Sequence, residues 1–128
     1  MLLPFTSSVN LPREARLEIS FATKKLEKDF ATEKQRVRVF GAGDAAKLLR
    51  RLTQLHAAAN LEPMRTLPGR CHELHGDREG QLAVDVTRST RLIFRPTADP
   101  PPSKEDGGLD WATVTAITIL EVTDYHGS

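Results

Sequence analysis

The stretch LPGRCHELHGDREGQLAVDVTRSTRLIF, residues 67–94, decides the fold of this 128-residue chain. Within it Leu82, Val84 and Val86 alternate with other residues, which is the period-two pattern of a strand with one buried face. Residues 92–94 continue this alternation. The turn sequence HGDREGQ and the short connection TRSTR separate the apolar pieces. The stretch therefore predicts three strands in meander order.

The residues before this stretch predict a strand followed by helices. Alternating apolar residues at 17–21 indicate a first strand. Thr23 and Thr32 are suited to cap two short helices, because their hydroxyls can accept free amide N–H groups. Asp44 is the predicted N-cap of a third and longer helix. That helix has one apolar stripe, formed by Leu48, Leu52, Leu55 and Ala59.

The last strand is predicted from the run VTAITILEV, residues 114–122, which is the longest β-branched run in the chain. Such a run favours a central position in a sheet. Asp124, Tyr125 and His126 follow it at once. An acid, a phenol and an imidazole at the end of a rigid strand are suited to proton transfer, although a polar terminus is also often only a solvated end.

The order of these elements predicts an α+β fold. Two to three N-terminal helices pack on one face of a small, mainly antiparallel sheet. Residues 1–15 have no clear period and are interpreted as an N-terminal extension, and residues 16–128 as a single domain. Residues 96–110 are rich in proline, glycine and acids, which predicts an exposed loop insertion in a hairpin.

Composition and charge limit the class of protein. The single cysteine, Cys71, excludes an internal disulfide and is most simply a small buried residue. The first residues lack a basic start and a long apolar run, so we expect a cytoplasmic protein without a membrane span. The net charge of +1 conceals a division, because residues 24–51 hold nine Lys or Arg and four acids, whereas residues 96–125 hold one and six. The basic part would attract phosphates, unless its cations only form a solvated face.

The residue types of Cys71, His72, His75 and His126 also suggest a metal site. On a strand, His72 and His75 are an odd number of residues apart and point to opposite faces, so they cannot easily share one ion. No metal and no cofactor is therefore expected.

Several spaced pieces of the chain together resemble a known family. The run LPGRCHELHGDREGQLAVDV, the later TRLIF, the segment KEDGGLDW and the terminal DYH are similar to the HigB-like branch of the RelE/ParE superfamily of bacterial toxins, over about residues 17–126. The resemblance implies the toxin of a type II toxin–antitoxin module, a ribosome-dependent mRNA endoribonuclease that inhibits translation. It also implies neutralisation by a helix-turn-helix antitoxin, which alone would bind operator DNA.

The positions that match the family's functional residues suggest roles for individual side chains. The resemblance implies that His72, Arg91, Asp124 and His126 are catalytic, with Arg91 on the phosphate, His126 or His72 in acid–base exchange, and Asp124 orienting an imidazole or taking the proton. Further candidates for RNA contacts are Arg70, His75, Arg78, Tyr125, Lys47, Arg50 and Arg51. His75 stands where many relatives place a lysine, so a titratable group replaces a fixed cation.

Two other functions remain open at the level of sequence. ParE-like members of the same superfamily share the scaffold but bind DNA gyrase without cleaving RNA, so the fold does not determine the target. An inactive homologue that only binds its antitoxin is the other alternative.

Overall fold

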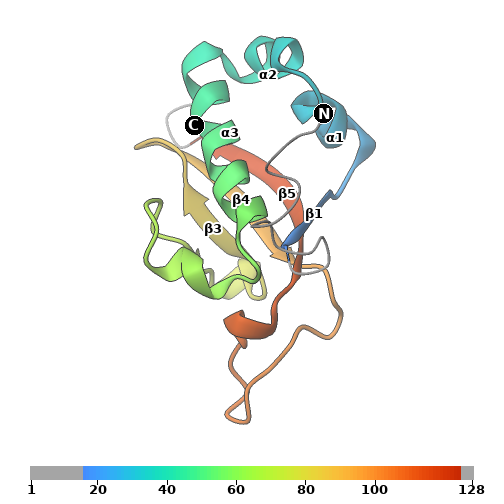
Figure 1. Cartoon of the computed structure of the whole chain (residues 1–128), viewed down its shortest axis with the longest axis vertical. Coiled ribbons are helices and arrows are strands. Elements are labelled where there is room, and N and C mark those ends of the chain that lie inside the picture. Colours follow the sequence, from blue (N-terminus) through green and yellow to red (C-terminus); the bar gives the residue numbers. More distant parts are fainter. Residues whose placement is uncertain (1–15, 125–128) are drawn as a thin grey trace, which may run out of the picture.

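The computed structural model describes residues 16–124, which form one five-stranded sheet with helices on one side (Figure 1). The strands lie in the order β1-β5-β4-β3-β2. Strand β1 pairs with β5 in parallel, and the other three pairs are antiparallel. Strand bounds are β1 Glu18–Phe21, β2 His72–Glu73, β3 Leu82–Asp85, β4 Thr90–Pro96 and β5 Ala116–Asp124. The predicted α+β class and the predicted meander are both confirmed.

Strand β5 has the interior position that its β-branched sequence predicts, although β4 is the strand at the centre. It lies between β1 and β4 and is the longest strand of the described sheet. Its register against β4 shifts between Ile93 and Phe94, so that Ile93 faces Glu121 and Phe94 faces Ile119. Such a bulge bends a strand and increases its twist.

The helices are α1 (Lys24–Phe30), α2 (Glu33–Phe40) and α3 (Ala42–Ala57). The predicted caps of the first two are confirmed, since the hydroxyl of Thr23 accepts the Leu26 amide and that of Thr32 accepts the Gln35 amide, each at 3.1 Å. Such a cap contributes about 1 kcal/mol of helix stability.

The predicted start of α3 is wrong. The helix begins at Ala42 with Gly41 in the N-cap position, and Asp44 lies inside the first turn. Gly41 has a φ of 86°, which glycine adopts readily and other residues rarely do. This conformation lets the chain turn directly from α2 into α3. Asp44 instead accepts a hydrogen bond from Thr90 of β4 at 3.2 Å, and its charge still suits the N-terminal end of the helix dipole.

One hydrophobic core lies between α3 and the sheet, where the predicted apolar stripe of α3 meets alternate strand residues. Leu48 and Leu55 are fully buried against Val84, Phe94 and Ile119. Burial of each such side chain contributes about 1.5–3 kcal/mol. Figure 1 shows α3 running across the sheet, with α1 and α2 at one end of it.

The predicted insertion connects β4 to β5 and extends from the end of the sheet opposite α1 and α2 (Figure 1). Trp111, near the end of this connection, attaches it to the rest of the molecule. The indole is buried, donates through Nε1 to Glu73 at 2.9 Å, and lies 3.9 Å below the guanidinium of Arg65. A buried indole with a satisfied N–H and a cation over its face is a stable anchor.

Gly69 brings the segment before β2 unusually close to β3. Its amide carbonyl accepts the Asp85 amide at 2.6 Å, and its φ is +111°. A Cβ atom at this position would lie 2.6 Å from Cγ2 of Val84 and 2.9 Å from Nε of Arg51. Both the backbone conformation and the available space therefore require glycine.

We expect Gly69→Ala to lower the free energy of unfolding by about 2–5 kcal/mol, since it adds a positive-φ penalty of about 1–2 kcal/mol to overpacking of about 1–3 kcal/mol. Gly80→Ala is the matched control, because Gly80 has a φ of +89° and open space around its Cβ position. The control reports the conformational penalty alone. Urea unfolding of both variants measures the difference, and equal losses would contradict the packing contribution.

Cys71 is a buried member of the core, as predicted. Desolvation by burial raises the pKa of its thiol from 9.0 to about 12, and the nearby charge of Arg65 offsets this only in part. The group is therefore a neutral thiol at physiological pH and is unsuited to act as a nucleophile.

We expect iodoacetamide to alkylate Cys71 about 10³-fold more slowly in the folded protein than in urea at pH 8, because the raised pKa removes the reactive thiolate. Mass spectrometry at timed intervals measures the rate. Equal rates in the two states would show that the thiol is not protected by the fold.

Candidate functional site

The sheet face opposite α3 carries several polar side chains in two rows, which also include the buried apolar residues Ala83 and Ile93, and we call it the polar face. Cross-strand partners share a face, so the register places His72, Ala83, Ile93 and Glu121 in the first row. The second row consists of Asp85, Arg91 and Thr123. The rows are about 7 Å apart along the strands, and strands are about 4.8 Å apart, which puts the Cα atoms of His72 and Arg91 about 12 Å from each other.

Asp85 is the centre of an arginine cluster on this face. Its Oδ2 accepts from Nε and Nη2 of Arg70, each at 2.7 Å, and its Oδ1 lies 3.2 Å from Nε of Arg91. Arg91 is 25% exposed and Arg70 is 70% exposed. Asp85 therefore gathers two guanidinium groups from different segments of the chain, and guanidinium groups are donors that suit a phosphate.

His72 is held by the same short segment. Its Nδ1 lies 2.6 Å from the backbone carbonyl of Arg70, and a carbonyl can only accept a hydrogen bond. Nδ1 must therefore carry the proton, and in the neutral ring Nε2 is the nitrogen with the lone pair. Nε2 is therefore the ring nitrogen of His72 that is left to accept a hydrogen bond or a proton.

Arg70 itself has a φ of +48°, the only positive value among the described residues other than glycine. A left-handed backbone is unusual for arginine and has to be stabilised by its surroundings. The contacts of its guanidinium with Asp85 and of its carbonyl with His72 fix both ends of this residue. Arg70, with its strained backbone, thus connects His72 to Asp85.

Arg78 also reaches the polar face. It lies in the turn between β2 and β3 and donates to Glu121 of the first row at 2.6 Å and to Gln81 at 2.7 Å. The hydroxyl of Thr123, opposite Arg91, is buried and has no hydrogen-bond partner among the described residues. The face therefore contains three of the arginines that the sequence analysis selected.

The other predicted RNA-contacting residues lie elsewhere. Arg51 of α3 donates through Nε to the backbone carbonyl of Asp85 at 2.8 Å, so it supports the edge of β3 from the helix side. Lys47 and Arg50 are exposed on α3, away from the polar face. His75 is exposed in the β2–β3 turn, with its Nδ1 4.0 Å from a carboxylate oxygen of Glu79.

The predicted tail residues are only partly described. Asp124 ends β5 opposite Thr90, and alternation along the strands places this pair on the face that the helices cover. The role of Asp124 in proton transfer stays a prediction. Tyr125 and His126 lie outside the described residues.

Asp85 and Glu121 are the charged residues of the two rows that the sequence did not indicate. Asp85 lies at an outward position of a strand that is otherwise apolar, between Val84 and Val86. An acid in that position indicates either a solvated face or a partner of opposite charge. Only the fold shows that its partners are two arginines from different segments.

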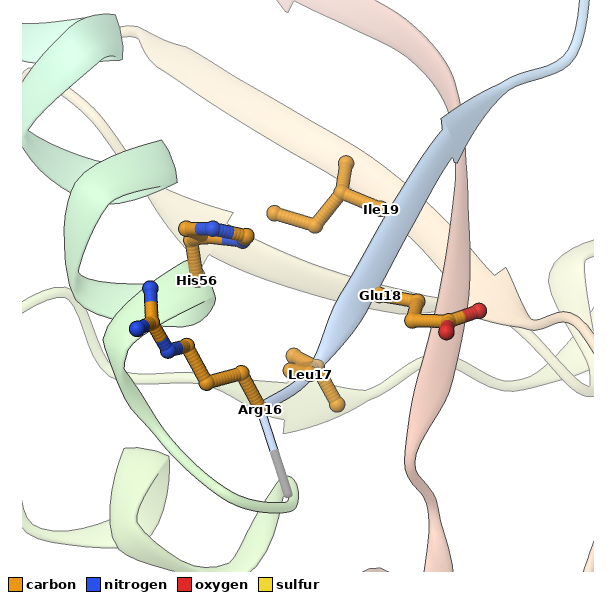
Figure 2. Close-up of a pocket in the computed structure, with 5 residues that line it drawn as sticks. All are labelled: Arg16, Leu17, Glu18, Ile19 and His56. Atoms are coloured by element: carbon orange, nitrogen blue, oxygen red, sulfur yellow. The ribbon is translucent and has the colours of Figure 1, made fainter. Parts of the chain in front are cut away.

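A pocket of about 560 Å³ lies on another part of the molecule, at the start of β1. Figure 2 shows Arg16, Leu17 and Ile19 with His56 of α3 at this pocket, while Glu18 points away from His56. It shares no residue with the arginine cluster. We place the candidate site on the polar face because the cations and the oriented histidine gather there, whereas the pocket has one arginine and one histidine without a described hydrogen bond.

Two further findings concern residues 16–124. Within this range no group of three His, Cys, Asp or Glu side chains is arranged to hold a metal ion. None of the helices in it has the length and apolar character needed to span a membrane.

Comparison of the sequence with protein-family models and with curated proteins gives no match. Solved structures do match. A YoeB/ParE toxin from Agrobacterium tumefaciens superposes with a TM-score of 0.51 at 12% identity, over 84% of this chain and 98% of that one. A YoeB dimer from Staphylococcus aureus gives a TM-score of 0.49 at 18% identity, over 88% and 99% of the two chains.

A YoeB–YefM complex from Staphylococcus aureus gives a TM-score of 0.49 at 16% identity, over 85% of this chain and 97% of that one. At such identities a superposition shows the fold alone and says nothing about activity. Of these three, only the first has a TM-score above 0.5, so only that one supports the fold. The chain therefore has the α+β fold of the YoeB/ParE toxins, with its arginine cluster and its oriented histidine on the sheet face opposite α3.

Proposed function

We propose that this protein is the toxin of a type II toxin–antitoxin module, of the HigB-like kind, and that it cleaves mRNA on the ribosome. The observation that supports this proposal best is that His72, Arg70 and Arg91 share the polar face, within reach of one nucleotide. The toxin fold and the resemblance of the sequence agree with this function.

The polar face supplies the groups that RNA cleavage by the ribose 2′-hydroxyl needs. The hydroxyl loses its proton to a base, its oxygen bonds to phosphorus, and the bond to the 5′-oxygen breaks as that oxygen gains a proton. In this proposal Nε2 of His72 exchanges a proton, and such acid–base help contributes about 10²–10⁴-fold. Arg91 and Arg70 stabilise the charge that grows on the phosphate, and one such donor contributes about 10²–10³-fold.

The ribosome completes the site by holding the mRNA in line. Positioning of reacting groups contributes about 7–11 kcal/mol, which explains how a shallow surface with few catalytic groups suffices. The exposed cations of α3, Lys47 and Arg50, contact RNA phosphates outside the reaction centre in this proposal. Such contacts weaken as salt rises.

The proposed partners are a cognate helix-turn-helix antitoxin, the ribosome and mRNA. Operator DNA is bound only through the antitoxin, and the protein acts in the cytoplasm, where ribosomes are. These assignments follow from the sequence resemblance.

We expect Arg91→Ala to lower cleavage of mRNA on purified ribosomes by about 10²–10³-fold, because it removes a cation from the developing charge. His72→Gln should lower it by about 10²–10⁴-fold, because an amide cannot exchange the proton. Primer extension measures cleavage, and growth after induction measures toxicity.

Arg88→Ala and His56→Gln are the matched controls, since both side chains are exposed and lie outside the polar face. Both should cleave like the wild type. Undiminished cleavage by Arg91→Ala and His72→Gln would remove these residues from the mechanism. Loss of DNA supercoiling before any loss of translation would overturn the proposed activity in favour of gyrase binding.

A further inference from the structure

We infer that Asp85 is a positioning residue that holds the guanidinium groups of Arg70 and Arg91 side by side for one phosphodiester; this role rests on the proposed RNA cleavage. Neither the pattern of the sequence nor the fold comparison selects Asp85. The inference comes from the contacts that its side chain and its backbone make.

Each oxygen of the Asp85 carboxylate contacts a different arginine. Oδ2 accepts both Nε and Nη2 of Arg70 at 2.7 Å, and Oδ1 lies 3.2 Å from Nε of Arg91. Arg70 precedes β2, whereas Arg91 lies on β4 across from Asp85. A single carboxylate therefore joins two cations that would otherwise repel each other.

The backbone of Asp85 is fixed as firmly as its side chain. Its amide donates to Gly69 at 2.6 Å, and its carbonyl accepts Nε of Arg51 at 2.8 Å. Three arginines from three segments of the chain thus contact this one residue. An aspartate held at both its backbone and its side chain is suited to orient others, because it cannot easily move itself.

The contacts extend from Asp85 to the histidine. Asp85 holds the side chain of Arg70, and the backbone carbonyl of Arg70 accepts Nδ1 of His72 at 2.6 Å. Arg70 has the strained φ of +48°, so its backbone depends on these contacts. Loss of the Asp85 charge would therefore loosen both the phosphate-binding arginines and the ring that exchanges the proton.

Asp85 acts through the arginines and does not contact the substrate in this scheme. A carboxylate facing a phosphodiester would repel it, whereas both oxygens of the Asp85 carboxylate face guanidinium groups. Its substitution should therefore affect the alignment of the reacting groups more than the binding of mRNA. A shift of about 1 Å in such groups costs about 10²-fold in rate.

The test uses Asp85→Asn, which keeps the size of the side chain but removes its charge, in steady-state cleavage of mRNA on purified ribosomes. We expect kcat to fall about 10–100-fold, with KM changed less than about 3-fold. Asp85→Glu restores the charge on a longer side chain and should recover part of the lost kcat. Asp77→Asn is the matched control, since Asp77 is an exposed acid in the β2–β3 turn.

A second measurement reports on the arginines themselves. In ¹⁵N spectra of the full chain, we expect the Nε–H signals of Arg70 and Arg91 to be protected from exchange with water in the wild type. Asp85→Asn should shift both signals and speed their exchange, while Asp77→Asn should leave them unchanged. A purely structural role would lower thermal stability but would not give this pair of changes with KM preserved.

The outcomes separate the two proposals. Normal cleavage by the wild type with unchanged kcat and unchanged Nε–H signals in Asp85→Asn would overturn the positioning role alone. Equal losses in kcat and in ribosome binding would also overturn it, since they would show that Asp85 serves binding. Failure of the wild type to cleave mRNA under any of these conditions would overturn the proposed function and the positioning role with it.

Discussion

The close approach of Gly69 to the edge of β3 is the constraint on which the polar face depends. The 2.6 Å contact between the Gly69 carbonyl and the Asp85 amide joins the incoming segment to the sheet just before β2 begins. This contact places Arg70 beside Asp85 and, two residues later, His72 beside Ala83. A residue with a side chain at position 69 would push the segment away from Val84. The chemistry of the face thus depends on a position that has no side chain.

The elements that could be predicted from the sequence are those that local physics determines. The caps at Thr23 and Thr32 depend on residues three positions away, and the strand residues Leu82, Val84 and Val86 show a period of two that turns them all to one side. The start of α3 could not be placed from the same rules, because they favour Asp44 over Gly41 as a cap, whereas in the fold the Asp44 carboxylate accepts a hydrogen bond from Thr90.

The candidate site was predictable in composition but not in arrangement. The family resemblance implied roles for Arg70, His72 and Arg91 in phosphate chemistry, whereas their association depends on pairing between strands that are far apart in the chain. Asp85 was missed because a single acid on a strand carries no local signal of a partner. The uneven charge along the sequence pointed to a basic helix surface, yet the arginines at the centre of the site come from the sheet and its turns.

The parallel pairing of β1 with β5 has a consequence for how the protein is made. Ser20 contacts Thr118, 98 positions later, so β1 cannot find its neighbour until nearly the whole domain has been synthesised. Such distant pairing is slow to form compared with the local contacts of the helices and the meander. Because β5 also supplies Glu121 and Thr123 to the polar face, the nascent chain exposes helices and a hairpin before it exposes a finished surface. A partner that recognises the helices would therefore meet its target earlier than any substrate that needs the completed sheet.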